Sequence, residues 1–238
     1  MASISVKARA SSCLGVTPPL SIRRHVFGYI WGGSMDRQLS LKRQLDLIRT
    51  NAFNLCVFLV GHEEDFSGEF TIDEARRMQF AVDVMRELYS QVGVGVRRIF
   101  WRYIPVDEAG GYTSVDASEA TDLTEDFSGP NDGIDVFFVT TVTDAGGWSN
   151  VDGPCDKSEK GERTGAVLEV GNSAQFLGIL LAHEVGHYLG LPHAGNITNV
   201  MGDDSDGDGI GSINGTSVNL TTSQGNRMKS HCSIRPSC

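Results

Sequence analysis

Three histidines fall within eleven residues of this chain, in the pattern H-E-x-x-H-x-x-G-x-x-H. His183 and His187 are four residues apart, so on a helix both imidazoles project from the same face. Gly190 allows the chain to leave that helix sharply with a positive φ, and the turn then brings His193 back toward the other two rings. The pattern therefore predicts a helix over about residues 173–189 that ends in a tight turn, with three imidazoles converging on one point.

Imidazoles are common zinc ligands, and three protein ligands leave a fourth position for water, as in catalytic rather than structural zinc sites. Glu184 follows the first histidine, close enough to act on a metal-activated water without being a ligand itself. The alternative is a chance match on a helix with ordinary surface histidines, expected in roughly one in 10⁴–10⁵ chains of this composition. The sequence therefore predicts one catalytic Zn2+ ion bound by His183, His187 and His193, with Glu184 as the general base.

Composition argues against two other classes of function. The formal net charge is −10, whereas binding to nucleic acid phosphates needs clustered lysine and arginine. The longest apolar runs, such as residues 176–182, are far too short to cross a bilayer. We therefore expect neither nucleic acid nor membrane as a partner, and the length of 238 residues suits one sizeable domain.

The rest of the chain alternates between strand and helix patterns. Thr71 and Glu74 form a capping box that starts a helix ended by Gly93, and an earlier helix is predicted over about residues 36–50. Short apolar runs predict strands over residues 54–60, 95–104, 134–141, 145–151 and 164–170. The acidic stretch of about 106–133 is expected to be a long surface loop. This order of elements predicts an α/β fold with a mostly parallel sheet and helices packed on it.

Together with the histidine motif, Met201 resembles the turn methionine that metzincin-clan zinc metallopeptidases place beneath the metal. Residues 220–228 look like the closing helix of pappalysin-like and reprolysin-like members of that clan. Residues 146–155 are similar to the reprolysin edge strand and the cysteine after it. The resemblance implies a twisted, mostly parallel sheet with an antiparallel edge strand, two long helices and a small C-terminal subdomain below the zinc cleft.

The same resemblance suggests how the chain is divided. Residues 1–34 are predicted to be an N-terminal arm or pro-segment, because they contain no strong periodicity. Residues 35–238 are then the zinc peptidase catalytic domain, with an upper part to about residue 190 and a lower part over residues 191–238.

The activity implied by the resemblance is that of a monomeric zinc-dependent endopeptidase, which hydrolyses peptide bonds in a protein or peptide substrate. The substrate would pair with the edge strand by β-augmentation at Gly146, Gly147 and Trp148. Asp203 departs from the family pattern, since many relatives carry there a tyrosine that helps hold the transition state. Two alternatives stay open: a catalytically inactive binding module with the metzincin fold, and a zinc hydrolase that acts on non-peptide amides.

The five cysteines contain no C-x-x-C pair, and their odd number leaves at least one thiol outside any disulfide. Cys56 lies in an apolar strand and is expected to be a buried free thiol. By the resemblance, Cys155 pairs with Cys232 or Cys238 and ties the upper part to the lower part. Cys13 resembles a pro-segment cysteine that binds the zinc ion in some metzincins. The alternative is an ordinary thiol in a flexible arm.

We expect a secreted or extracellular protein, although the first twenty residues contain no apolar signal segment.

A second cation is predicted just after the turn methionine. Asp204, Asp206 and Asp208 follow the D-x-D-x-D-G spacing of calcium loops, with the carbonyl of Ile210 at position seven. Gly215 stands where a complete EF-hand loop has its bidentate glutamate, so further ligands must come from elsewhere. The alternative is a solvated acidic turn, since short turns of aspartate and glycine are common. Neighbouring carboxylates repel each other, which favours a structural Ca2+ ion bound with modest affinity.

Overall fold

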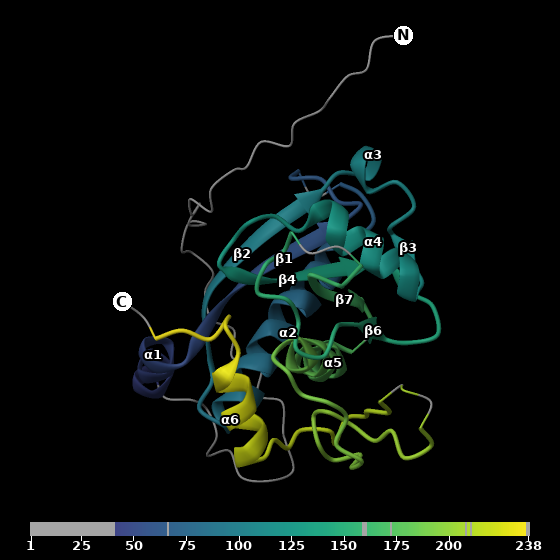
Figure 1. Ribbon diagram of the computed structural model, residues 1–238. Helices are drawn as coiled ribbons and strands as arrows, with labels where there is room; N and C mark the ends of the chain where they lie inside the picture. The colour runs from purple at the N-terminus through teal and green to yellow at the C-terminus, as the bar shows by residue number, and fades with distance from the viewer. Residues whose placement is uncertain are drawn as a thin grey trace.

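The structure is a computed structural model that describes residues 41–65, 67–158, 161–171, 173–207, 209 and 211–236. These residues contain a five-stranded sheet in the order β2-β1-β4-β7-β6 (Figure 1). Its strands are β1 (Ala52–Val60), β2 (Gly95–Ile104), β4 (Gly133–Val139), β6 (Gly147–Trp148) and β7 (Gly165–Glu169). β6 runs antiparallel to β7 at the edge of the sheet, and the other strands run parallel to their neighbours. The predicted α/β fold, with a mostly parallel sheet and an antiparallel edge strand, is therefore confirmed.

Helices cover both faces of this sheet. The two long helices α2 (Ile72–Ser90) and α5 (Ala174–Tyr188) pack on one face, and α4 (Ala117–Phe127) lies on the other (Figure 1). The helix α2 begins at the predicted capping box, in which the side chains of Thr71 and Glu74 each accept a backbone amide of the other. Both long helices and the start of α2 are therefore confirmed.

The alternation of side chains along the strands produces the two layers. In β4, Val136 and Phe138 join the apolar cluster under α2 and α5, whereas Phe137 and Val139 join the cluster under α4. Every residue of β4 is buried. A strand covered on both faces needs a continuous apolar run, and such runs are what predicted the central strands.

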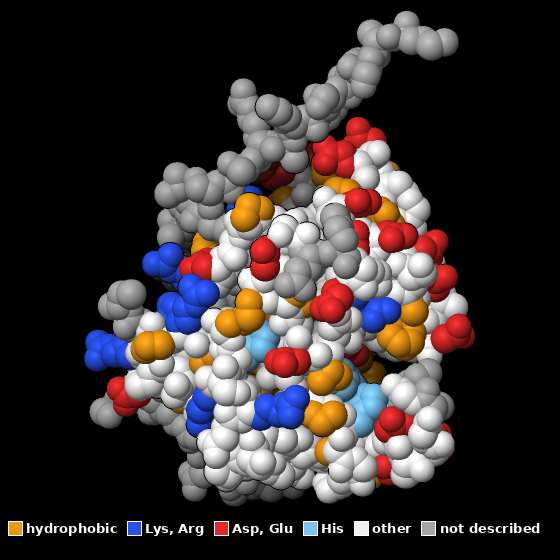
Figure 2. All heavy atoms as spheres, viewed as in Figure 1, with side chains coloured by type: hydrophobic (Ala, Val, Ile, Leu, Met, Phe, Trp, Pro, Cys, Tyr) orange, Lys and Arg blue, Asp and Glu red, His pale blue; other side chains and the backbone are white. Residues whose placement is uncertain are grey.

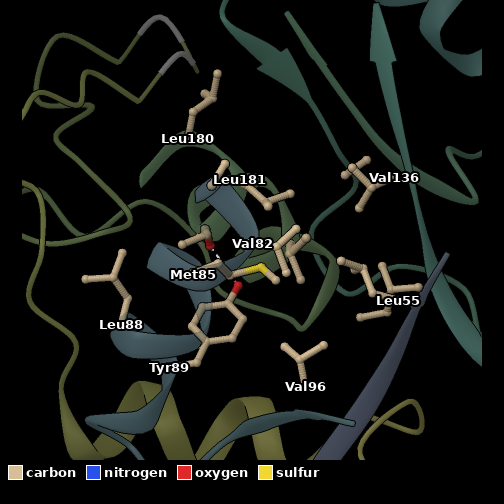
Figure 3. Close-up of a cluster of buried hydrophobic side chains, with 14 of the residues drawn as sticks. Leu55, Val82, Met85, Leu88, Tyr89, Val96, Val136, Leu180 and Leu181 are labelled. Carbon is tan, nitrogen blue, oxygen red and sulfur yellow. Dashed lines mark hydrogen bonds between the residues drawn. The ribbon is translucent and has the colours of Figure 1, made fainter. Parts of the chain in front are cut away.

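The helix that carries the histidine motif is packed tightly against α2. A Cβ atom on Gly178 would lie 2.4 Å from the Cβ atom of Val84. The two helices therefore approach closely at Gly178, because glycine has no side chain. The buried hydroxyl of Tyr89 donates a hydrogen bond to the carbonyl of Ala182 at 2.8 Å. Figure 3 shows this tyrosine in one buried cluster with side chains of α2, α5, β1, β2 and β4. These contacts fix the position of α5 and of the residues it presents.

The prediction of a long surface loop over about residues 106–133 is wrong. This segment contains α3 (Val106–Ala109), β3 (Ser114–Val115) and α4. The side chain of Asp116 accepts the amides of Ser118 and Glu119, and Glu119 reaches back to the amide of Asp116, which completes a second capping box. Leu123 is fully buried in the cluster under α4. The acidic composition of the segment concealed a short amphipathic helix.

The remaining elements lie outside the five-stranded sheet and the helices described above. The helix α1 (Leu41–Thr50) is the described part of the predicted first helix, and the residues before it, including the predicted arm, lie outside the described residues. β5 (Thr141–Val142) pairs with β3 in a small second sheet. The closing helix expected over residues 220–228 is present as α6 (Thr222–Ser230). None of the helices in the described ranges combines the length and apolarity that crossing a membrane requires.

Candidate metal centre

The three histidines of the motif meet at the C-terminal end of α5. His183 and His187 lie one turn apart on α5, and Gly190, with a φ of 93°, turns the chain so that His193 joins them. The Nε2 atom of His187 lies 3.0 Å from Nε2 of His183 and 3.1 Å from Nε2 of His193. The structure thus brings together all three predicted ligands in a group that could hold a metal ion.

Two of the rings are oriented by backbone carbonyls. Nδ1 of His183 lies 2.8 Å from the carbonyl oxygen of Val200, and Nδ1 of His187 lies 2.7 Å from that of Leu191. A carbonyl oxygen only accepts hydrogen bonds, so each Nδ1 carries the proton. Each Nε2 therefore presents a lone pair to the centre of the group, which is the form in which imidazole binds a metal.

The ring of His193 is oriented by a carboxylate instead. Its Nδ1 lies 3.3 Å from Oδ2 of Asp204, whose Oδ1 accepts the amide of Gly209 at 3.0 Å. The Gly209 amide holds the pKa of the Asp204 carboxyl below its usual range, so this group is an ionised acceptor. The third Nε2 therefore faces the same centre as the other two.

The arrangement of the rings fits a bound cation. Burial lowers the pKa of His183 to about 4 and that of His187 to about 3, so both rings are neutral near pH 7. Neutral rings whose Nε2 lone pairs face each other at 3.0 Å repel, since neither nitrogen has a proton to share. Zinc bonded to nitrogen at about 2.0–2.1 Å in a tetrahedral site separates its ligands by roughly 3.3–3.4 Å. The residues present therefore fit a zinc ion.

Glu184 lies on α5 beside this group and is almost fully buried. Burial raises its pKa to about 8, and the positive charge of Arg163 partly opposes that rise. A cation at the three rings would favour the ionised carboxylate, which is the form that accepts a proton. The side chain also depends on a glycine, because a Cβ atom on Gly147 would lie 2.9 Å from Oε1 of Glu184.

Met201 is fully buried in a turn that packs against α5. Its amide donates to Oδ1 of Asn199 at 2.9 Å. Asn199 and Gln224 exchange two side-chain hydrogen bonds at 3.0 and 2.9 Å, which tie the turn to α6. The structure therefore places Met201 next to the helix of the histidine motif, as the resemblance implies.

A cleft of about 410 Å³ passes the three rings and Glu184. Gly146, Gly147 and Trp148, the predicted substrate-binding residues, line it together with Gly209 and Gly211 from the segment after Met201. Histidine side chains border a hollow on the face shown in Figure 2. The predicted edge strand over residues 145–151 shortens to β6, but its residues lie in the cleft as expected.

Arg163 also lines the cleft, although no sequence motif pointed to it. Its guanidinium carbon lies 5.4 Å from the centroid of the Trp148 ring, and its Nη2 donates to the carbonyl of Ala117 at 2.7 Å. This side chain therefore connects the edge strand to α4 and brings a positive charge near Glu184. The surrounding sequence has no periodicity or spacing that could have identified it.

The predicted calcium loop forms part of the rim of the cleft. Asp208 and Ile210, two of the predicted ligands, lie outside the described residues. Asp203 and Ser212 form an antiparallel bridge that closes the loop. Among the described residues, the carboxylates of this loop do not gather into a group of three ligands, and Asp204 faces His193. The calcium ion stays a prediction.

Cys155 and Cys232 form a disulfide, one of the two predicted pairings. It joins the segment after β6 to the segment after α6, across 77 residues of sequence. Cys56 is buried, as predicted, and forms no disulfide with another described cysteine, whereas Cys13 and Cys238 lie outside the described residues. The disulfide therefore links a segment of the predicted upper part to a segment of the predicted lower part.

A comparison with protein families identifies the family to which this chain belongs. A family model described as metallo-peptidase family M12B, reprolysin-like, matches residues 69–194, which is more than half of the chain and includes all three histidines. A comparison with curated proteins found no match. Among solved structures, the chain is similar to archaemetzincin from Methanopyrus kandleri, with 16% identity and a TM-score of 0.48. That similarity covers 76% of this chain and 95% of the other.

Proposed function

Because this chain belongs to the reprolysin-like metallopeptidases of family M12B, in the metzincin clan, we propose that it is a zinc-dependent endopeptidase with Glu184 as its general base. One observation carries the proposal. Three Nε2 atoms converge on one point, and the buried carboxyl of Glu184 lies beside them in the cleft. His183, His187 and His193 would hold the zinc ion.

The zinc ion, when bound, supplies a Lewis acid that polarises the scissile carbonyl and makes water more acidic. Glu184 accepts the proton of the attacking water as the oxygen adds to the carbonyl carbon. The same carboxyl then delivers that proton to the leaving amine nitrogen as the carbon–nitrogen bond breaks. Burial of Glu184 suits this role, because bulk water does not compete for the proton it carries.

The edge strand supports internal cleavage of a longer chain. In the described part of the molecule, β6 is the terminal strand of the sheet and pairs with β7 along one side. An extended peptide can add to the other side, with its backbone running along Gly147 and Trp148. A peptide bound in this way extends in both directions past the three histidines, which suits an endopeptidase.

The test uses internally quenched peptides with both termini blocked, so that cleavage must be internal. Wild-type protein should cleave them, a zinc chelator should abolish the activity, and added zinc should restore it. Glu184→Gln should lose about 10²–10⁴ in rate, because the base is lost while the ligands remain. It should still contain one zinc ion per chain by elemental analysis. Glu108→Gln, an exposed change of the same kind, is the control.

The alternatives give different results in this assay. An inactive binding module would hold zinc and cleave no blocked peptide. A zinc hydrolase of non-peptide amides would release amines from small amides and leave the peptides intact. Turnover by Glu184→Gln at the wild-type rate would contradict the assigned base.

A finer part of the proposal concerns calcium. The D-x-D-x-D-G spacing from Asp204 supports a Ca2+ ion in the rim of the cleft. Millimolar calcium should then raise the melting temperature of wild type but not that of Asp206→Ala. Equal shifts in the two proteins would indicate that the loop is a solvated acidic turn without a bound ion.

The disulfide supports a secreted protein, because disulfides persist in oxidising compartments. Size-exclusion chromatography tests the expected monomer.

A further inference from the structure

We propose that Asp204 is a positioning residue of the metal centre, whose carboxylate fixes the ring of His193 and couples it to the backbone of Gly209. This inference rests on the zinc site of the proposed function. It concerns how that site is assembled, so it can be tested without measuring peptide cleavage.

His193 has weaker local support than the other two predicted ligands. His183 and His187 belong to α5, which is packed into the core against α2, and both rings are bound to backbone carbonyls. His193 lies beyond the end of α5, outside any helix or strand, and its side chain is 17% exposed. Helix geometry therefore does not restrict its rotamer, and its Nδ1 partner has a larger share in orienting the ring.

The carboxylate that fills this role is held from both sides. Oδ2 of Asp204 accepts from Nδ1 of His193 at 3.3 Å, and Oδ1 accepts from the Gly209 amide at 3.0 Å. Asp203 and Ser212 close the base of the loop with backbone hydrogen bonds of 3.0 and 2.8 Å. Each oxygen of Asp204 thus has a different partner, so the carboxylate bridges the loop and the ring.

The returning arm of the loop contacts the rings a second time. A Cβ atom on Gly211 would lie 2.5 Å from Nε2 of His193 and 3.0 Å from Cε1 of His183. The loop therefore contacts His193 at both ring nitrogens, by a hydrogen bond at Nδ1 and by close packing at Nε2. A shift of Asp204 or Gly211 would therefore disturb the position of the His193 ring.

The chemistry predicts a measurable effect on metal binding. A carboxylate that accepts a hydrogen bond from the Nδ1–H group makes Nε2 more basic and holds the ring in its ligating orientation. Loss of such a partner typically lowers metal affinity by about 10–100-fold. Asparagine keeps one acceptor oxygen, so it can retain the bond to His193 or the bond to Gly209 but not both.

The experiment measures zinc affinity by chelator competition, and the visible absorption of the cobalt-substituted protein, in calcium-free buffer. Asp204→Ala should bind zinc about 10–100-fold more weakly and change the cobalt spectrum, because the third nitrogen is displaced. Asp204→Asn, which is nearly isosteric, should give a smaller loss and keeps the test valid if the alanine variant does not fold. Two controls should retain wild-type affinity: Asp122→Asn, which removes an exposed charge on α4, and Ser205→Ala in the same loop.

A second pair of variants tests the packing contact. Gly211→Ala should weaken zinc binding, whereas Gly215→Ala should not, since a Cβ atom there meets nothing within 4 Å. Wild-type zinc affinity in both Asp204 variants would overturn the proposal. So would an equal loss in Asp122→Asn, which would indicate a general charge effect. A loss for Asp204→Ala that appears only when calcium is added would assign the carboxylate to calcium and overturn it too.

Discussion

The sulfur of Met201 occupies the space where a side chain on Gly186 would be, since a Cβ atom on Gly186 would lie 2.7 Å from the Sδ atom. Gly186 precedes His187 in α5, so the turn of Met201 packs directly on the helix backbone between two predicted ligands. Alanine is favoured over glycine in a helix by about 1 kcal/mol, so this contact gives a physical reason for a glycine here.

Gly186→Ala should therefore lower the free energy of unfolding by about 1–3 kcal/mol, because the added methyl overpacks the contact with the sulfur. Urea denaturation measures this loss. Combining it with Met201→Ala should recover part of the loss, since the sulfur is then absent. Gly171→Ala is the control, because a Cβ atom there meets nothing within 4 Å. Strict additivity of the Gly186 and Met201 changes would show that the two residues do not interact.

A change in the edge strand should affect Glu184 without touching a ligand. In Gly147→Ala the new methyl would meet the Glu184 carboxyl at 2.9 Å and the Val167 carbonyl at 2.8 Å. A displacement of about 1 Å from the reacting position can lower the rate by about 10²-fold. We expect that loss in kcat/KM on blocked peptides, with full zinc content. Gly111→Ala, in open space, should behave as wild type. Loss of zinc along with activity would indicate wider damage.

The disulfide between Cys155 and Cys232 should contribute about 2–4 kcal/mol to stability, because it closes a long loop in the unfolded chain. The double change to serine should lower the unfolding free energy by that amount in chemical denaturation. A reducing agent should reproduce the loss in wild type and have no further effect on the variant. Equal sensitivity of both proteins to the reducing agent would contradict this assignment.

A buried ion pair should make stability depend on pH. Nζ of Lys157 lies 2.8 Å from Oδ2 of Asp135, a fully buried residue of β4. Burial raises the pKa of Asp135, and Lys157 lowers it in part. In Lys157→Met that pKa should rise further, so the folded state binds the proton more tightly than the unfolded state. The destabilisation caused by the raised Asp135 pKa is then absent below the ordinary aspartate pKa of about 3.9. It grows as pH rises toward the pKa of Asp135 in the folded state.

We therefore expect Lys157→Met to lose about 3–5 kcal/mol near pH 8 and clearly less near pH 5, measured by urea denaturation at each pH. Adding Asp135→Asn should remove most of this difference between the two pH values. A loss that is the same at both pH values would show that packing of the lysine, rather than its charge, is responsible.

The parts of the fold that sequence predicts well are those with a local cause. Helical spacing places His183 and His187 on one face, and Gly190 allows the turn, so convergence of the rings follows from a few neighbouring residues. The central strands are buried on both faces and are therefore mostly apolar along their whole length. The helix α4 escaped prediction because acidic residues dominate it, although the capping box of Asp116 and Glu119 marks its start.

The parts that sequence did not predict depend on contacts between distant segments. Arg163 reaches the cleft because β7 lies beside β6, and nothing in its own neighbourhood indicates that position. Asp204 fits the residue spacing of a calcium-binding loop. Its contact with His193, however, depends on the backbone bridge between Asp203 and Ser212. Local patterns suggest which chemistry a residue can do, and tertiary packing decides which partner it meets.

The order of the sequence separates the scaffold from the completed site. The sheet is finished by Glu169 and two histidines are in place by the end of α5, whereas His193, Met201 and Asp204 all follow. A chain emerging from the ribosome can therefore form the sheet and α5 before the third predicted ligand is synthesised. The proposed peptidase site would then be completed last, on a scaffold that has already formed, and an unfinished chain would lack the proposed activity.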